Sequence, residues 1–169
     1  MQLNGVGAIV TGGASGLGGA TAEMLARNGA KVAVFDLNEE TGQAKAAAIG
    51  GKFFKVNVAD DASVAEAITA AEAVHGVARV LVNCAGIATA IKTVGKEAAP
   101  HPLDMFRRTV EVNLIGTFNV ISKFAARLST AEPIGEERGV IVNTASVAAF
   151  DGQIRQAAYS VAEGGVVGL

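Results

Sequence analysis

The chain has 169 residues, of which 50% are hydrophobic and 18% are charged, and its formal net charge is −2. This length favours a single domain over residues 1–169, and the apolar share excludes a mainly disordered chain. No segment concentrates Lys and Arg, and no stretch approaches the roughly 18 apolar residues of a membrane helix, so neither a nucleic-acid nor a membrane partner is expected.

Short runs of β-branched residues alternate with longer alanine-rich stretches along the chain. In chain order, the pattern predicts a strand at 6–11, a helix at 15–28, a strand at 31–35, a helix at 39–49, a strand at 52–58, a helix from 60 or 61 to 75, a strand at 79–83, a helix at 103–128, a strand at 139–144 and a helix that starts near 156. Segments 90–102 and 130–138, which contain proline and glycine, are predicted to be exposed loops. The strand runs are continuously apolar, as in strands buried on both faces. The sequence therefore predicts an α/β fold with a Rossmann-type, doubly wound parallel sheet.

A glycine-rich turn follows the first predicted strand. Gly12, Gly16 and Gly18 stand in the pattern T-G-x-x-x-G-x-G, with Ser15 and Leu17 among them. Glycine lets the backbone turn tightly and approach a phosphate, and the N-terminus of the next helix offers free N–H groups. The turn favours a dinucleotide pyrophosphate site. A tight strand-to-helix turn without a ligand is the alternative.

An acidic residue, Asp36, ends the second predicted strand. It lies roughly 20 residues after the glycine turn, where an acid holds the adenosine ribose hydroxyls of a dinucleotide. A carboxylate there repels a 2′-phosphate, so NAD is favoured over NADP as the cofactor. Asp36 could instead cap the helix that follows, although Asn38 could serve as well.

The single cysteine, Cys84, cannot form an internal disulfide. No Cys/His cluster has the spacing of zinc ligands, so no metal site is expected, and we interpret Cys84 as a packing residue. The first residues lack the basic and apolar regions of a signal peptide. Together these features favour the cytoplasm.

Four further motifs accompany the later strands and helices. They are Asn83-Cys84-Ala85-Gly86 after the fourth predicted strand, Asn113 within an apolar helix, Ser146 after the fifth strand and Tyr159 thirteen residues beyond Ser146. Together with the glycine turn, these motifs resemble the short-chain dehydrogenase/reductase family. The stretches 84–88, 113–120 and 144–153 resemble its type 2 3-hydroxyacyl-CoA dehydrogenase branch, and the resemblance covers essentially the whole chain.

The resemblance implies a strand order of 3-2-1-4-5 and NAD as the cofactor. Glycines of the turn would cradle the pyrophosphate, Asp36 would hold the adenosine ribose, and Asn57-Val58 would lie at the adenine. The implied cofactor contacts are Gly12, Ser15, Gly16, Leu17, Gly18, Asp36, Asn57, Val58, Asn83, Ala85 and Gly86. The implied assembly is a homo-oligomer, a homotetramer in the family, that uses the helix at 103–128 and the helix carrying Tyr159.

The resemblance also implies the catalytic residues. Ser146 would hydrogen-bond the substrate oxygen, Tyr159 would act as general acid/base, and Asn113 would support a water relay. Gln153 and Gln156 would shape the substrate pocket together with Ser146 and Tyr159. The substrate would be a small molecule, a secondary alcohol such as a 3-hydroxyacyl-CoA.

The same chemistry follows from the residue types alone. Hydride transfer between an alcohol and a nicotinamide needs a group that takes the hydroxyl proton and a donor that stabilises charge on the oxygen. A tyrosine and a serine near the ends of neighbouring strands supply both. Alternatives remain for each residue: Tyr159 as an interface aromatic, Ser146 as a helix cap and Asn113 as a satisfied buried polar group.

One residue departs from the family motif Y-x-x-x-K. Glu163 stands four residues after Tyr159, in the place of the lysine. Residues four apart share one face of a helix, and a cation there favours tyrosine phenolate whereas a carboxylate disfavours it. We therefore predict severely impaired hydride transfer.

The length is a second departure, because family members continue beyond the position of Leu169 with two more strands. A sheet that ends at 139–144 would carry an apolar edge. Two functions therefore compete: an NAD-dependent oxidoreductase, and a catalytically impaired NAD-binding module. An unstable fragment with neither property is a third reading, against which cooperative unfolding would count.

Overall fold

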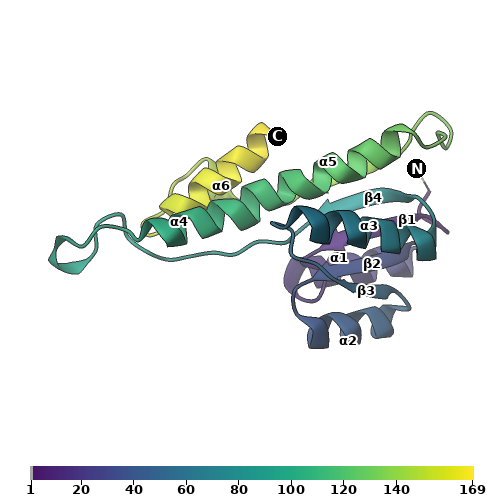
Figure 1. The fold of residues 1–169 in the computed structure, drawn as a ribbon, viewed down its shortest axis with the longest axis horizontal. Helices are drawn as coiled ribbons and strands as arrows, with labels where there is room; N and C mark the ends of the chain where they lie inside the picture. Colours follow the sequence, from purple (N-terminus) through teal and green to yellow (C-terminus); the bar gives the residue numbers. More distant parts are fainter. Residues whose placement is uncertain (1) are drawn as a thin grey trace.

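A five-stranded parallel sheet organises the computed structural model, which describes residues 2–169 (Figure 1). The strand order, β3-β2-β1-β4-β5, confirms the doubly wound Rossmann-type fold inferred from the sequence. The elements are β1 (Gly7–Thr11), α1 (Gly16–Arg27), β2 (Lys31–Asp36), α2 (Glu39–Ile49), β3 (Lys52–Lys55), α3 (Asp61–His75), β4 (Ala78–Asn83), η1 (Lys96–Ala98), α4 (Leu103–Val110), η2 (Glu111–Ile115), α5 (Gly116–Ser129), β5 (Val140–Asn143), η3 (Val147–Ala149) and α6 (Ala157–Gly168).

Two hydrophobic clusters form the core, one on each face of the sheet. Successive residues of a strand point to opposite faces, so Ile9 of β1 enters one cluster and Val10 the other. Ile68 of α3 and Phe124 of α5 pack in the first cluster, and Ala22 of α1 packs in the second. The central strands are therefore buried from both sides, and their carboxyl ends are held rigidly at one edge.

Strand β3 is shorter than the predicted strand at 52–58. Its pairing with β2 ends at Lys55, opposite Asp36. The backbone N–H of Val56 still donates to the carbonyl of Asp36 at 2.9 Å, and the chain then turns, with the N–H of Asp60 donating to the carbonyl of Asn57 at 3.0 Å. Val56 is buried beside the sheet although it lies outside β3. The apolar sequence that predicted a strand therefore extends beyond the end of the paired strand.

The helix predicted at 103–128 is divided into α4, η2 and α5. The middle part, η2, is a π-helical turn with one extra residue per hydrogen-bonded ring, and it contains Asn113. The hydroxyl of Thr117 donates to the carbonyl of Asn113 at 2.7 Å, which satisfies an acceptor in the widened turn. Such turns are frequent at functional sites, so this one marks the surroundings of Asn113 for attention.

The last helix, α6, lies away from the sheet. It packs along α4 and η2, where this long helical unit extends beyond the strands (Figure 1). The strand before it, β5, is at the edge of the sheet, and Val140 and Val142 are exposed by 42% and 47% while Ile141 packs towards α5. Among the described residues, the apolar edge expected from the sequence is thus present.

The turn before α6 contains a strained residue. Arg155 has a φ of 74°, a left-handed conformation that costs a residue with a Cβ about 1 kcal/mol relative to glycine. We expect Arg155→Gly to raise the free energy of unfolding by about 0.5–1 kcal/mol, measured by urea denaturation. Arg155→Ala keeps the strain and is the control. An equal increase in the free energy of unfolding in both variants would show that the effect comes from loss of the guanidinium group and not from relief of backbone strain.

Candidate active site

A cavity of about 440 Å³ opens at the carboxyl ends of β1, β2 and β4. This is the edge at which open α/β sheets bind ligands. Its lining joins the glycine turn, the end of β2, the segment after β3 and the exit from β4: Gly12, Ser15, Gly16, Leu17, Gly18, Phe35, Asp36, Leu37, Val56, Asn57, Val58, Cys84, Ala85, Gly86, Ile87 and Val112. Of the eleven implied cofactor contacts, the structure gathers all but Asn83 around this cavity.

Gly12 and Gly18 of the glycine turn have no room for a side chain. A Cβ on Gly18 would lie 2.2 Å from the carbonyl oxygen of Gly12, and a Cβ on Gly12 would lie 2.9 Å from the backbone of Ala85. Gly12 and Gly16 also have φ values of 63° and 54°, which favour glycine. The backbone of this turn can therefore come into direct contact with a ligand.

Helix α1 begins at this turn without a side-chain cap. Ser15 occupies the N-cap position and its side chain makes no capping hydrogen bond, and the first turn of α1 carries no acidic residue. The first N–H groups of the helix consequently have no acceptor on their own cap, and they carry the positive end of the helix dipole. This arrangement suits a phosphate.

Asp36 is positioned by two backbone donors. Its Oδ2 accepts from the N–H of Ala14 at 3.1 Å, and its Oδ1 accepts from the N–H of Asn38 at 3.0 Å. The helix cap is Asn38, whose Oδ1 accepts from the N–H of Thr41 at 3.1 Å. Asp36 thus keeps lone pairs available for a ligand in the cavity. The residue that caps α2 is Asn38 and not Asp36.

Asn83 lies beneath the cavity and not in its wall. It is 3% exposed, its Oδ1 accepts from the hydroxyl of Thr11, and its Nδ2 donates to Oδ1 of Asn143 at 3.0 Å. These contacts join the ends of β1, β4 and β5. Cys84, which we interpreted as a packing residue, does line the cavity, and its Sγ lies 3.3 Å from Oγ1 of Thr144.

Several cavity residues were missed by the motif analysis. They are apolar neighbours of the motif positions: Phe35, Leu37, Val56, Ile87 and Val112. Four of the five stand within two residues of a predicted contact, so the position of a strand end is the signal that could have found them. Val112 comes from η2 and directly precedes the motif residue Asn113, so its signal is a helical motif position and not a strand end.

Asn113 is a fully engaged buried amide. Its Oδ1 accepts from the N–H of Ile87 at 2.9 Å, and its Nδ2 donates to the carbonyl of Ile87 at 3.0 Å and to Oε1 of Glu163 at 3.1 Å. It therefore ties the exit from β4 to α6. The description of Asn113 as a satisfied buried polar group fits these contacts, and its nearness to Glu163 joins it to the Tyr159 helix.

Glu163 is a buried carboxyl, 6% exposed, in the place of the motif lysine. Burial raises the pKa of this carboxyl, and the hydrogen bond from Asn113 opposes the rise only in part. Among the described residues, no ion pair involves Glu163. The site therefore holds a carboxyl that resists ionisation where the motif has a cation.

The raised pKa of Glu163 predicts a pH-dependent stability. Because the folded chain holds this proton to higher pH than the unfolded chain, the contribution is complete below the ordinary value of 4.5 and is lost as the pH rises through the folded pKa. We expect Glu163→Gln to raise the free energy of unfolding at neutral pH by about 1–3 kcal/mol and to change it little near pH 4. Urea denaturation of both chains at neutral pH and near pH 4 tests this prediction. An equal increase in the free energy of unfolding at the two pH values would show that the effect does not come from ionisation of Glu163.

Ser146 and Tyr159 come from two elements that pack against each other, η3 and α6. The Oγ of Ser146 accepts from the N–H of Ala148 at 3.2 Å, at the start of η3, and η3 packs against α6. Tyr159 is half-buried on α6, one turn before Glu163. Neither residue lines the cofactor cavity itself. The capping alternative for Ser146 agrees with its hydrogen bond.

The two glutamines stand on the turn into α6. Gln153 is exposed and lines a separate, second cavity, whereas Gln156 is half-buried at the N-cap position of α6 and its carbonyl accepts from the N–H of Ser160 at 2.7 Å. Of the two glutamines, Gln153 is thus the one that lines this second cavity.

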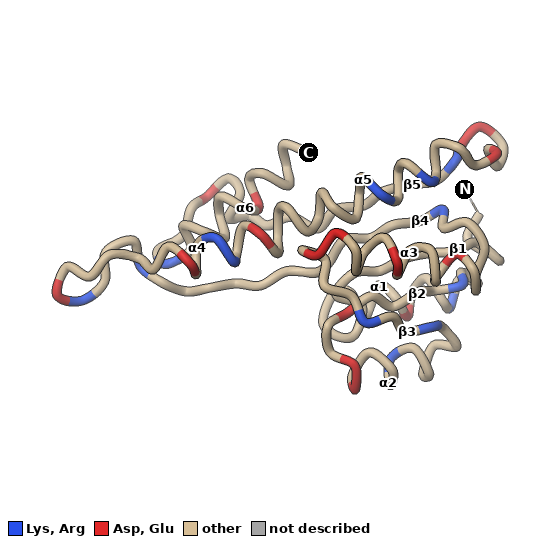
Figure 2. Tube along the Cα trace, viewed as in Figure 1, with Lys and Arg blue, Asp and Glu red and all other residues tan. Residues whose placement is uncertain are grey.

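Residues 2–169 contain neither a candidate metal site nor a candidate membrane-spanning helix. No three His, Cys, Asp or Glu side chains there are grouped so that they could hold a metal ion. No helix in that part of the chain is long and apolar enough to cross a membrane. Figure 2 shows that the basic and acidic residues are spread over helices and loops and do not separate onto two faces.

Comparisons with known proteins agree with this fold. A model of the short chain dehydrogenase family matches residues 7–169. The chain belongs to the short-chain dehydrogenase family, which confirms the resemblance inferred from the motifs.

The similarity extends to one branch of the family. The chain is 48% identical over 172 residues to 3-hydroxyacyl-CoA dehydrogenase type-2 of Rattus norvegicus and 47% identical to that of Homo sapiens, with 99% of this chain and 66% of each relative covered. The crystal structure of 3-hydroxyacyl-CoA dehydrogenase type-2 from Mycobacterium avium matches with a TM-score of 0.93 at 39% identity, covering 99% of this chain and 68% of that one. The chain thus spans about two thirds of the length of these relatives.

Proposed function

We propose that this chain is an NAD-dependent oxidoreductase that transfers hydride between a secondary alcohol, a 3-hydroxyacyl-CoA, and NAD. The observation that carries the proposal is the cavity at the carboxyl edge of the sheet, whose lining includes both an uncapped helix N-terminus and the carboxylate of Asp36. The curated relatives named 3-hydroxyacyl-CoA dehydrogenase type-2 support the substrate class.

The residues present fit a dinucleotide. The backbone of Gly12 and Gly18 and the first N–H groups of α1 would hold the pyrophosphate, since no Cβ intervenes there. Asp36 would accept hydrogen bonds from ribose hydroxyls. When bound, NAD supplies the hydride acceptor of the reaction.

Two hydroxyl groups would handle the substrate oxygen. Ser146 would donate a hydrogen bond to it, and Tyr159 would take the alcohol proton as the hydride leaves. Asn113 would hold the helical framework behind Tyr159 through its contacts with Ile87 and Glu163. The chain supplies positioning and proton transfer.

A second candidate function is a catalytically impaired NAD-binding module. Glu163 favours it, because a buried, uncharged or negative carboxyl cannot supply the positive field that promotes tyrosine phenolate. The cofactor cavity does not include Glu163, so we expect NAD binding in both candidates. The two candidates therefore differ in rate and not in cofactor affinity.

Two measurements test the proposal. Calorimetric titration with NAD is expected to give binding, and absorbance at the NADH band is expected to rise when a short-chain 3-hydroxyacyl-CoA is added. Binding without NADH selects the impaired module. Absence of NAD binding by a chain that unfolds cooperatively would overturn both candidates.

Asp36 provides a test of the NAD preference. We expect the unchanged chain to bind NAD more tightly than NADP, and Asp36→Asn to lower NAD affinity about tenfold while narrowing that preference, since the neutral amide no longer repels a 2′-phosphate. Titration calorimetry with both dinucleotides measures the ratio. Glu40→Gln, an exposed change on α2 outside the cavity, is the matched control.

The setting proposed for this activity is a homo-oligomer, a homotetramer, in the cytoplasm, acting on a small molecule without a nucleic-acid or membrane partner. Exposed apolar side chains support self-association: Ile115 at the end of η2 and Phe118 at the start of α5 are 52% and 53% exposed, and Val161 on α6 is 53% exposed. Light scattering during size-exclusion chromatography measures the number of copies.

A further inference from the structure

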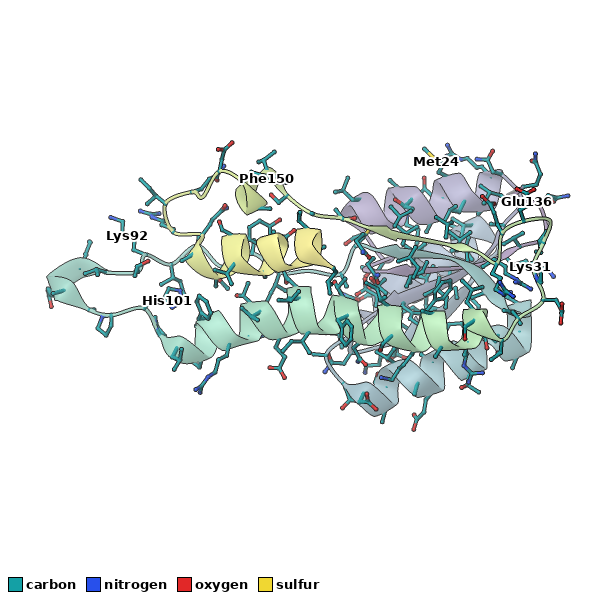
Figure 3. All side chains as sticks on the ribbon, turned by 90° about the horizontal axis from the view of Figure 1, so that it is seen from above. Met24, Lys31, Lys92, His101, Glu136 and Phe150 are labelled. Carbon is teal, nitrogen blue, oxygen red and sulfur yellow. The ribbon has the colours of Figure 1, made fainter. Side chains whose placement is uncertain are left out.

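A second cavity, of about 560 Å³, lies between the extended loop after β4 and the turn into α6. Lys92 enters it from the loop, and Arg155 and Ser160 enter from the turn and the first part of α6. In Figure 3, Lys92 projects beside the turn that leads into α6. The two segments are 63 residues apart (155 − 92), so the fold assembles this space.

The charge of this cavity is positive. Lys92 and Arg155 are the only charged residues in its lining, and neither forms an ion pair with any described residue. The acids nearest in sequence, Glu97 and Asp151, do not line it. Two cations from different segments, both without a carboxylate partner, favour an anionic ligand.

Two further observations point to the same space. The Oγ of Ser160 is buried and has no hydrogen-bond partner in the structure, although Ser160 lines the cavity. Arg155 is held at a φ of 74°, and residues held in such conformations cluster at ligand sites. An anion with acceptor oxygens would satisfy the hydroxyl and engage the strained arginine.

The remaining lining is apolar. Val94, Ile154 and Val161 contribute aliphatic surface next to the two cations. The cavity is therefore suited to a ligand that joins an anionic group to a less polar part. This combination is the chemistry of a CoA thioester, in which phosphates are joined to an organic chain.

We propose that Lys92, Arg155 and Ser160 form a subsite for the phosphate groups of a CoA thioester. The identity of the thioester rests on the proposed function, whereas the anion site rests on the cavity itself. Ser160 follows Tyr159 directly on α6, and Arg155 lies on the turn before that helix, so the subsite would hold the charged part of the substrate while the secondary alcohol reacts.

Titration calorimetry with coenzyme A, in the presence of saturating NAD, tests the subsite. NAD occupies the first cavity, so remaining binding reports the second. We expect Arg155→Gly and Lys92→Ala each to weaken coenzyme A binding about tenfold or more, and added salt to weaken it further. Lys96→Ala changes a lysine of the same loop that does not line the cavity, and is expected to have no effect.

Arg155→Gly also removes backbone strain, so a folded variant is expected, and Lys92→Ala tests the site without changing α6. Pantetheine, which lacks the phosphates, should bind at least tenfold more weakly than coenzyme A. Unchanged binding in both variants, or equal binding of pantetheine, would overturn the subsite. Inorganic pyrophosphate that binds as tightly as coenzyme A would overturn the thioester assignment and retain the anion site.

These outcomes are separate from turnover. Coenzyme A binding that depends on Arg155, found in a chain that forms no NADH, would contradict the oxidoreductase proposal and leave the subsite intact. If the chain forms NADH but its affinity for coenzyme A does not change when Lys92 or Arg155 is replaced, the subsite is wrong and the oxidoreductase proposal stands.

Discussion

Glu163→Lys is expected to raise the rate of NADH formation by about 100-fold or more. General acid–base groups contribute roughly 10²–10⁴ to enzymatic rates, and the tyrosine is effective only when its phenolate is stabilised. Glu163 stands one helical turn after Tyr159, so an ammonium there would face the same side of α6. Initial rates with NAD and a short-chain 3-hydroxyacyl-CoA measure the change.

Glu163→Gln is the control for charge. It keeps an amide that can accept the hydrogen bond from Asn113 and removes the buried acid, but it adds no cation. It is expected to leave the rate within a few fold while stabilising the fold at neutral pH. A glutamine variant as fast as the lysine variant would show that the negative charge alone, and not the missing cation, limits turnover.

A fast unchanged chain would have a different meaning. If the rate at neutral pH is already high and Glu163→Gln lowers it by orders of magnitude, the carboxyl itself takes part in the reaction and the impairment prediction is wrong. Slow turnover in the unchanged chain, in Glu163→Lys and in Glu163→Gln would show that a residue other than Glu163 limits the rate.

Gly18→Ala is expected to weaken NAD binding by at least about 100-fold. The added Cβ would lie 2.2 Å from the carbonyl oxygen of Gly12 and 3.2 Å from the Cα of Gly13, so backbone must move where the ligand makes its contact. Overpacking of this kind also costs about 1–3 kcal/mol of stability. Titration with NAD gives the affinity and urea denaturation gives the stability.

Gly164→Ala is the matched control on another helix. Its Cβ would meet only the carbonyl oxygen of Ala149 at 3.9 Å, an ordinary contact, and the interior of α6 favours alanine by roughly 0.5–1 kcal/mol. It should therefore bind NAD normally and unfold at slightly higher urea. Gly18→Ala that retained NAD affinity would mean that the pyrophosphate does not approach this turn.

The sheet could be predicted because its signals are local. Continuous apolar runs define the strands, and the turn glycines and Asp36 follow strand ends that lie at one edge in any parallel sheet. The division of the long helix at η2 was not predicted. A π-helical turn changes the helical period over only five residues, which a hydrophobic pattern does not resolve.

The contacts that decide the chemistry were not predictable in the same way. Glu163 and Asn113 are 50 residues apart, and their hydrogen bond depends on how α6 packs against η2. Asn83 illustrates the reverse case, since its motif position suggested the cavity floor while its side chain joins three strands beneath it. A motif locates a residue in the chain and leaves the direction of its side chain to tertiary packing.

The cofactor cavity has a further consequence for how affinity and chemistry can change independently. Every residue that lines it falls between Gly12 and Val112, whereas Ser146, Tyr159 and Glu163 come later in the chain. Because these lining residues all precede β5, we expect substitutions after β5 to change the reaction rate more than the affinity for the nucleotide. Nucleotide binding would then stabilise the first part of the fold by mass action and leave α6 free to diverge.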